Sequence, residues 1–338
     1  MSVRDPSYGI LLPIFVGNSY QPGPVERYYP IDYAFPFNAS FSWEQLSGIS
    51  TSGERLGYDS LWASDHFMLG KANFDSWTVL SALSTMTSKV KLGTFMSCDG
   101  YRNPALVAKM AANLAIISSK RFVLGYGAGW YQPEFEAYGV PFPQLKERIE
   151  KMNEGLEIVE GLLTKPKFSF SGKYYTVKDA TNDPKPSAKV PVFLGGGSKR
   201  ILRAVARSGD GWDVGPDVSP ARYGALIDYL KAEMKTRGRD FDEITRSVHF
   251  RVVLGKDEAE VSEKKRLIRE AVKNVDLSTT TKPGPSDFNI EDALIGTPSA
   301  VRERIRTYAK LGCNQMVFMF MDYPRYDSPA LFAQTVMQ

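Results

Sequence analysis

Cysteine, histidine and long apolar runs are scarce in this sequence of 338 residues. The two cysteines, Cys98 and Cys313, lie far apart without partners at metal-ligand spacing, which argues against a disulfide framework or a cysteine metal site. The two histidines, His66 and His249, are too few for a multi-histidine metal site. No apolar run approaches the ~20 residues needed to span a bilayer, and the first residues lack the apolar region of a signal peptide. We therefore expect a reduced, cytoplasmic protein with no metal and no membrane association.

An excess of charge of one sign is also lacking. The 42 basic and 38 acidic residues give a net charge of +4, and the basic residues are scattered rather than gathered in a stripe. This distribution does not predict a nucleic-acid partner. The hydrophobic fraction of 43% and the charged fraction of 24% are typical of a soluble globular protein, and the length allows a large core.

Short apolar runs alternate with longer segments of helical spacing along the whole chain. The predicted strands are Tyr8–Phe15, Ser60–Ser64, Val90–Met96, Arg121–Tyr126, Val190–Leu194, Gly211–Gly215, Ser247–Leu254 and Gln315–Phe320. The clearest predicted helices are Asn103–Ser118, Leu145–Leu163, Ser198–Ala206, Ala221–Lys235 and a segment from Thr297 to about Leu311. Alternation of strands and helices predicts a parallel sheet, and eight such units favour a closed α/β barrel, the (β/α)8 TIM barrel. No boundary separates two domains, so residues 1–338 are predicted to form one.

Three segments do not fit the repeat and are predicted to be insertions near residues 17–40, 164–188 and 274–292. Gly17–Ser40 is rich in Pro, Tyr and Phe and follows the first strand, so it would lie at the C-terminal face of the barrel as a lid or pocket wall. A packed aromatic surface loop is the alternative. Thr164–Ala188 contains a hairpin-like alternation around Ser171 and Gly172, and Asn274–Asp292 resembles a loop.

The segment Arg121–Phe142 begins as a strand and then carries glycine at every second position, at Gly125, Gly127 and Gly129. Glycine weakens a strand, since it packs nothing and adds entropy to the unfolded chain. We therefore expect that side chains are absent here because something must approach the backbone closely, and Trp130 follows directly. A planar ligand with polar edges would suit the place. A glycine-rich strand exit with Trp130 filling a gap in the core is the alternative.

Glycines also end the fifth predicted strand, where Gly195–Ser198 runs directly into a helix. Free amides and the helix dipole make such a turn an anion site, and Lys199 and Arg200 add positive charge in the first helical turn. Cations there are unfavourable for the helix itself, which suggests an anionic ligand such as phosphate. A tight turn with Ser198 as the N-cap is the alternative. No dinucleotide-binding fingerprint is present.

His66 follows Asp65 at the end of the second predicted strand, and imidazole exchanges protons near neutral pH. Adjacent strand residues point to opposite faces, so the two side chains should have different roles. A structural histidine in the barrel rim is the alternative for His66. His249 lies in mid-strand and is interpreted as structural. Trp62, Trp77 and Trp212 are assigned to the core, although Trp212, at a strand start, also fits a cofactor contact.

Several ordered motifs resemble the bacterial luciferase-like superfamily, and within it most closely the branch that uses the deazaflavin coenzyme F420. The motifs lie in Gly57–Phe67, Tyr101–Phe142 and Val190–Gly215, and a weaker similarity to the family lies in Ile295–Ile305. The resemblance implies a (β/α)8 barrel with an isoalloxazine-type ring at its C-terminal mouth. It also implies a homodimer, which is common in the family.

By position in those motifs, the resemblance assigns the site residue by residue. His66 would donate or accept a proton on the substrate, and Asp65 would lie at the ring and anchor the cofactor, so both are implied to be catalytic. The peptide around Phe95 and Met96 would form a bulge behind the ring, where the family often has a cis bond. The implied cofactor-binding residues are Asp65, Thr94, Phe95, Met96, Gly127, Ala128, Gly129, Trp130, Gly195, Gly196, Gly197 and Ser198.

The resemblance implies an F420-dependent oxidoreductase that transfers hydride between the deazaflavin and a small organic substrate. An FMN-dependent monooxygenase, which uses reduced flavin from a partner reductase and O2, is the alternative. Luciferase-type members place an arginine in the loop after the fourth strand for the flavin phosphate, where this sequence has Ala128 or Gly129. That departure weakens the FMN assignment. A flavin-binding protein without catalysis is a third alternative, disfavoured because Asp65 and His66 are both present.

Overall fold

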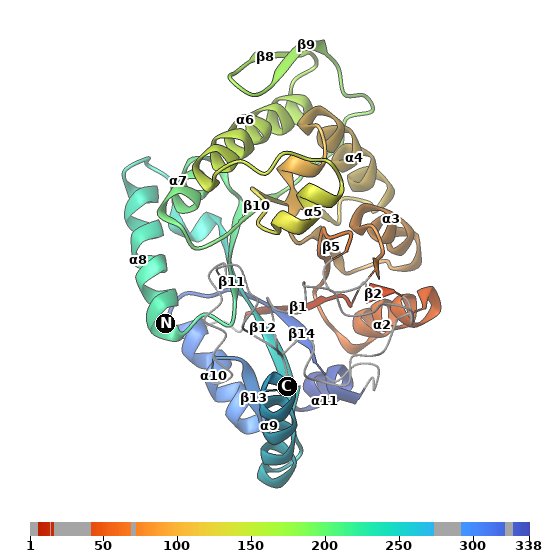
Figure 1. The fold of residues 1–338 in the computed structure, drawn as a ribbon, viewed down its shortest axis with the longest axis vertical. Coiled ribbons are helices and arrows are strands. Elements are labelled where there is room, and N and C mark those ends of the chain that lie inside the picture. Colours follow the sequence, from red (N-terminus) through yellow and green to blue (C-terminus); the bar gives the residue numbers. More distant parts are fainter. Residues whose placement is uncertain (1–5, 14, 17–41, 69–71, 274–291, 322–326) are drawn as a thin grey trace.

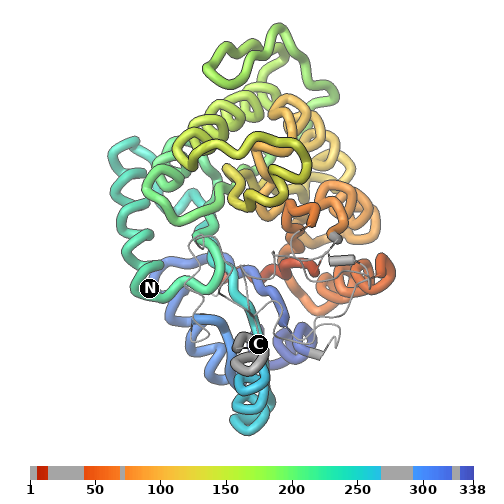
Figure 2. The backbone as a smooth tube through the Cα atoms, in the orientation of Figure 1, coloured from red at the N-terminus to blue at the C-terminus, as the bar shows by residue number. Residues whose placement is uncertain are grey.

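The computed structural model describes residues 6–13, 15–16, 42–68, 72–273, 292–321 and 327–338. Eight parallel strands form a closed barrel, with the neighbour order β10, β11, β12, β14, β1, β3, β5 and β7, and β7 pairs with β10 to close it. The barrel strands are β1 Ser7–Leu11, β3 Ser60–Ala63, β5 Lys91–Thr94, β7 Phe122–Gly127, β10 Val192–Gly195, β11 Gly211–Pro216, β12 Thr245–Leu254 and β14 Gln315–Phe320. Each corresponds to one of the eight strands predicted from the sequence. The chain follows the barrel round in sequence order (Figure 2).

Helices surround the strands (Figure 1). They are α2 Trp43–Leu56, α3 Ser76–Met86, α4 Pro104–Ile117, α5 Gln132–Ala137, α6 Leu145–Thr164, α7 Lys199–Ser208, α8 Pro220–Lys235, α9 Glu258–Lys273, α10 Pro298–Lys310 and α11 Asp327–Thr335. Their starts follow local chemistry: Ser42 and Gln45 form a capping box at α2, and Asn103 caps α4 ahead of Pro104. Short pieces accompany the barrel: β2 Phe15–Val16, β4 Ala72–Asn73, β6 Ser97–Cys98, β13 Leu294–Gly296, η2 Asp99–Tyr101 and η3 Phe241–Glu243.

Of the three predicted insertions, the middle one is a hairpin. β8 Phe168–Ser171 and β9 Thr176–Ala180 pair antiparallel, and the hairpin projects beyond α6 (Figure 1). The segment Gly17–Ser40 and all but the last residue of Asn274–Asp292 lie outside the described residues. In the described part of the chain, no helix is long and apolar enough to cross a membrane.

Alternation along the strands divides the core into two layers. Val248, Phe250 and Val252 of β12 pack outward, in the large cluster between barrel and helices. The inner cluster, inside the barrel, consists of Leu11, Trp62, Phe95, Val123, Phe193 and Val317. Trp62 fills space that both neighbouring strands leave: a Cβ at Gly93 of β5 would lie 2.2 Å from its ring, and one at Gly9 of β1 would lie 2.8 Å from its Nε1.

Met96 occupies the corresponding space nearer the mouth. A Cβ at Gly125 would lie 2.5 Å from the Met96 Sδ, one at Gly195 would lie 2.7 Å from its Cγ, and one at Gly127 would lie 3.2 Å from its Cβ. Gly125, Gly127 and Gly195 therefore leave room for Met96, and Gly125 also allows the close approach of the Thr94 carbonyl, 1.9 Å from where its Cβ would lie. The sequence pattern correctly indicated a backbone that tolerates no side chain, and the groups that require this belong to β5 and the loop after it.

Candidate active site

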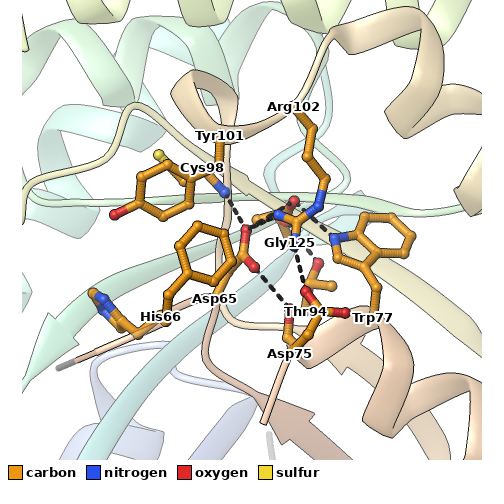
Figure 3. Close-up of polar contacts among 12 residues, drawn as sticks. Asp65, His66, Asp75, Trp77, Thr94, Cys98, Tyr101, Arg102 and Gly125 are labelled. Carbon is orange, nitrogen blue, oxygen red and sulfur yellow. Dashed lines mark hydrogen bonds and ion pairs between the residues drawn. The ribbon is translucent and has the colours of Figure 1, made fainter. Parts of the chain in front are cut away.

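The Asp65 carboxylate is buried just beyond β3 and accepts hydrogen bonds on both oxygens (Figure 3). Ser76 Oγ donates to Oδ1 at 2.9 Å. The Cys98 amide at 2.9 Å, Ser97 Oγ at 3.4 Å and the Arg102 guanidinium at 2.6 Å donate to Oδ2. The carboxylate thus ties β3 to α3, to β6 and to the start of α4. Its hydrogen-bonding capacity is taken up within the protein.

Arg102 bridges two carboxylates. One terminal nitrogen lies 2.6 Å from Asp65 and the other lies 2.6 Å from Asp75, the N-cap of α3. Burial disfavours the charged guanidinium, but the charge and hydrogen bond of Asp65 outweigh it and raise the pKa of Arg102. Arg102 lies within the Tyr101–Phe142 motif, but no local sequence pattern marks it as the ion-pair partner of Asp65.

His66 points away from Asp65 and belongs to a different cluster (Figure 3). Its Nδ1 lies 2.8 Å from Oε2 of Glu134 in α5. The same oxygen accepts the Tyr101 hydroxyl at 2.6 Å, and Oε1 accepts the amides of Phe67 and Met68, each at 2.7 Å. Burial alone would raise the pKa of Glu134, but these hydrogen bonds and the His66 charge lower it overall, so the carboxylate is ionised.

An ionised Glu134 accepts hydrogen bonds only, so Nδ1 of the neutral His66 ring carries the proton and Nε2 is the basic nitrogen. The ring stands edge-on to Trp130, with centroids 5.5 Å apart, and to Tyr131, with centroids 6.0 Å apart. Trp130 is 39% exposed, whereas Tyr131 is buried. Trp130 is thus a surface aromatic beside His66 rather than a filler of the core. Glu134 was missed because its partner lies 68 residues away.

The loop after β5 carries the bulge that the resemblance implied, and the Phe95–Met96 peptide is cis. Thr94 is fully buried, and its hydroxyl donates to the Gly125 carbonyl at 2.8 Å, which joins β5 to β7. Phe95 points into the barrel with the inner cluster.

The turn after β7 packs closely on the protein beneath it. Gly129 has a φ of 73°, which favours glycine, and a Cβ there would lie 2.6 Å from the Cys98 Sγ. Arg148 of α6 lies under the turn: its Nε donates to the Gly129 carbonyl at 3.3 Å, and its guanidinium sits 3.9 Å from the centre of the Phe142 ring. A cation therefore does lie at this turn, supplied by a later helix rather than by the loop itself.

The turn after β10 has the form expected of an anion site. Ser198 caps α7, accepting the Ile201 amide on its hydroxyl at 3.3 Å, and Gly196 has a φ of 123°. Among the described residues, the amides of Gly197, Lys199 and Arg200 have no acceptor, and the first turn of α7 has no acidic residue. Trp212 is buried and donates its Nε1 to the Gly196 carbonyl at 2.8 Å, so it supports this turn from the core.

His249 faces the barrel interior in a second histidine–carboxylate pair. Its Nδ1 lies 2.7 Å from Oδ1 of Asp213 in β11, and Ser247 Oγ donates to the other oxygen of Asp213 at 2.9 Å. The interpretation of His249 as a mid-strand structural residue did not anticipate this pair. A neighbouring strand supplies the carboxylate, and no local sequence pattern marks that relationship.

The second to fifth predicted strands correspond to β3, β5, β7 and β10, which are successive neighbours in the barrel. Their carboxyl ends therefore meet at one sector of the mouth. Three tryptophans assigned to the core, Trp62, Trp77 and Trp212, are buried. In the described residues, no three His, Cys, Asp or Glu side chains gather as metal ligands would.

Comparison with known proteins agrees with this architecture. The family model of the luciferase-like monooxygenases matches residues 7–315. An F420-dependent glucose-6-phosphate dehydrogenase from Intrasporangium calvum is 29% identical over 302 residues, which cover 82% of this chain and 89% of that protein.

Solved structures share the fold. An F420-dependent secondary alcohol dehydrogenase, in complex with an F420–acetone adduct, superposes with a TM-score of 0.76 at 18% identity and 99% coverage of both chains. A monooxygenase from Streptomyces bottropensis gives a TM-score of 0.76 at 20% identity and 98% coverage of both chains. Because the family model spans most of the chain and the barrel is closed as that fold requires, this protein belongs to the luciferase-like monooxygenase family.

Proposed function

We propose that this protein is an F420-dependent oxidoreductase that transfers hydride between the deazaflavin and a small alcohol or carbonyl compound. The observation that carries the proposal is the His66–Glu134 pair. The pair is suited to proton transfer and lies at the mouth of a luciferase-like barrel, beside the glycine-rich end of β7. The names of the relatives support the cofactor and the substrate class: an F420-dependent sugar-phosphate dehydrogenase and an F420-dependent secondary alcohol dehydrogenase.

The residues present fit such a cofactor. The free amides of Gly197, Lys199 and Arg200, with two cationic side chains and no acid in the turn, suit a phosphate. The bulge of Phe95 and Met96, together with Gly127–Trp130, would hold the ring. The bound deazaflavin would supply the hydride chemistry, and the protein would orient it and move the protons.

His66 is proposed as the proton-transfer residue for the substrate. Glu134 fixes the Nδ1–H tautomer, so Nε2 can take a proton from a substrate hydroxyl during oxidation or return it during reduction. Asp65 is proposed as a positioning residue, because four donors within the protein already occupy its carboxylate. It would act on the cofactor by holding the β3, β5 and α4 ends in place.

FMN is the second candidate cofactor, since Arg148 brings a cation to the turn at Gly129 and a monooxygenase shares the fold. The two cofactors are separated by titrating the purified protein with F420 and, in parallel, with FMN and reduced FMN. We expect micromolar quenching of F420 fluorescence and reduction of F420 by an alcohol without oxygen consumption. Binding of FMN alone, with oxygen uptake on addition of reduced FMN, would replace the proposal by the monooxygenase alternative.

The phosphate site has a matched control within the chain. Ser198 and Ser219 are both N-caps whose hydroxyls accept the amide three residues on. Asp also caps helices well, so Ser198→Asp and Ser219→Asp should both fold. We expect Ser198→Asp to weaken F420 binding at least tenfold by charge repulsion, with Ser219→Asp near the wild-type value. Equal affinities for both variants would remove Gly195–Ser198 from the proposed site.

A further inference from the structure

The side of the barrel opposite β5 carries ionisable rather than apolar side chains. β12 presents Ser247, His249 and Arg251 on its inward face, because the alternate residues Val248 and Phe250 pack in the outer cluster. β11 presents Asp213, and the β11–β12 register shifts between Asp213 and Pro216. This shift places Pro216, rather than the residue two beyond Asp213, opposite His249.

Asp213 holds the His249 ring by its Nδ1. The carboxylate accepts the Ser247 hydroxyl at 2.9 Å, the Gly215 amide at 3.0 Å and His249 Nδ1 at 2.7 Å. Both oxygens are thus used, and an acceptor at Nδ1 leaves Nε2 as the basic nitrogen of the neutral ring. Within the described part of the chain, no polar atom lies in hydrogen-bond range of Nε2.

The His249 ring contacts a residue of the proposed cofactor site. The His249 side chain is 14% exposed, equal to that of His66. Its ring stands edge-on to Phe95, the residue of the bulge, with centroids 4.9 Å apart. A carboxylate at Nδ1 fixes the orientation and tautomer of the ring, which packing alone would not require.

We propose that His249, oriented by Asp213, is a second proton-transfer residue of the active site. The inference rests on the proposed function. In oxidation of an alcohol, the C–H electron pair leaves as hydride for the deazaflavin, and the O–H bond breaks with its proton passing to His66 Nε2. With F420 bound, the ring that accepts the hydride would also need one proton on a ring nitrogen. The imidazolium form of His249, which carries a proton on Nε2 as well as on Nδ1, would donate it and return to the neutral Nδ1–H ring. One proton is taken up and one is given, so the reaction balances without a further oxidant.

The first test needs no cofactor. With only two histidines in the chain, 15N spectra of the imidazole rings resolve each residue, and His66→Gln assigns the signals. We expect a neutral His249 ring protonated at Nδ1, and Asp213→Asn should shift the ring toward the Nε2–H tautomer. A wild-type ring protonated at Nε2, or a tautomer indifferent to Asp213→Asn, would overturn the inference even if the His249 variants fail to fold.

The second test uses the loaded enzyme. We expect His249→Gln to lower turnover by about 100-fold or more, the range for loss of a general acid or base, with F420 affinity and melting temperature near wild type. The pH profile of turnover should also lose one of its limbs in the variant, because the group whose titration produces that limb has been removed. Asp213, which pairs with His249, and the Arg251–Asp217 ion pair, which joins β12 to the turn after β11, all remain in this variant.

The two failures are distinguishable. If the wild type binds and reduces F420 and His249→Gln has the same rate and pH profile, the inference is wrong and the proposed function stands. If the wild type does not bind F420, the proposed function fails and this inference fails with it.

Discussion

The Phe95 ring stands edge-on against the His249 ring, with centroids 4.9 Å apart and planes inclined at 82°, although β5 and β12 lie on opposite sides of the barrel. The contact closes the barrel at that level. Below it lie Trp62 and the other apolar side chains of the inner cluster. Above it lies the mouth, with an apolar bulge on one side and the Asp213–His249 pair on the other. We therefore expect this contact to form the floor of the proposed active site.

Asp65 and Arg102 should make the largest electrostatic contribution to stability at the mouth. Replacing Asp65 by Asn leaves a largely buried guanidinium without its buried carboxylate partner, so we expect a loss of about 3–5 kcal/mol in the free energy of unfolding. Asp75→Asn is the matched control, because Asp75 contacts the same guanidinium with a side chain that is 37% exposed. It should lose less than about 1 kcal/mol. Urea unfolding of both variants tests this, and equal losses would contradict the anchoring role of Asp65.

Glu134→Gln should reduce both turnover and the dependence of stability on acid. The folded pKa of Glu134 lies below its ordinary value of 4.5, so its contribution to stability is full above that value and is lost as the pH falls through the folded pKa. His66 and Tyr101 are the side chains that face it. The difference in unfolding free energy between wild type and variant, about 1–3 kcal/mol near pH 7, should shrink below about pH 4.5.

The kinetic effect of Glu134→Gln has its control on the same helix. Glu136 is exposed and contacts only Gln132 among the described residues, so Glu136→Gln should leave turnover unchanged. We expect Glu134→Gln to lower turnover roughly 10- to 100-fold through the wrong His66 tautomer. A difference in stability that does not vary with pH, or equal turnover in the two variants, would argue that Glu134 is merely packed.

Gly125→Ala should be among the most damaging single-methyl additions in the barrel. The new Cβ would lie 1.9 Å from the Thr94 carbonyl oxygen and 2.5 Å from the Met96 Sδ, so β5 and β7 would have to separate. We expect a loss of about 3 kcal/mol, with the cofactor site displaced. Gly48→Ala in α2 is the contrast: its Cβ meets nothing within 4 Å, and it should gain about 0.5–1 kcal/mol from helix propensity. Thermal unfolding distinguishes the two, and a stable Gly125→Ala protein would refute the packing argument.

Neither cysteine should react in the folded protein. Cys98 and Cys313 are both buried, and burial raises the pKa of Cys313 to about 12 and that of Cys98 still further above its usual range. A thiol reagent at pH 8 should label no cysteine in the native protein and both after unfolding in urea. Rapid native labelling of either thiol would mean that its surroundings open in solution.

Much of the barrel could be predicted from the sequence because strand, turn and helix signals are local. Apolar runs, helical spacing and cap residues such as Ser198 recur with every unit, and eight units imply closure. Helices α2, α3, α5, α9 and α11 were not among the helices named from the sequence. In α2 and α3, Ser, Thr and Gly lower the helix propensity, and both helices are capped by side chains, Ser42 and Asp75.

The eight strand–helix units, the closed barrel and the glycine turns at β7 and β10 could all be predicted from the sequence. Which side chains pair at the mouth depends on the folded chain. Glu134 meets His66, Asp213 meets His249, and Arg148 reaches the turn at Gly129 across many intervening residues. Periodicity encodes which face a residue takes, but a pair across the barrel depends on strand register and on the size of the side chains between. Gly125 shows the difference: the pattern predicted a backbone without a side chain, and only the fold identified the Thr94 carbonyl and Met96 as the reasons.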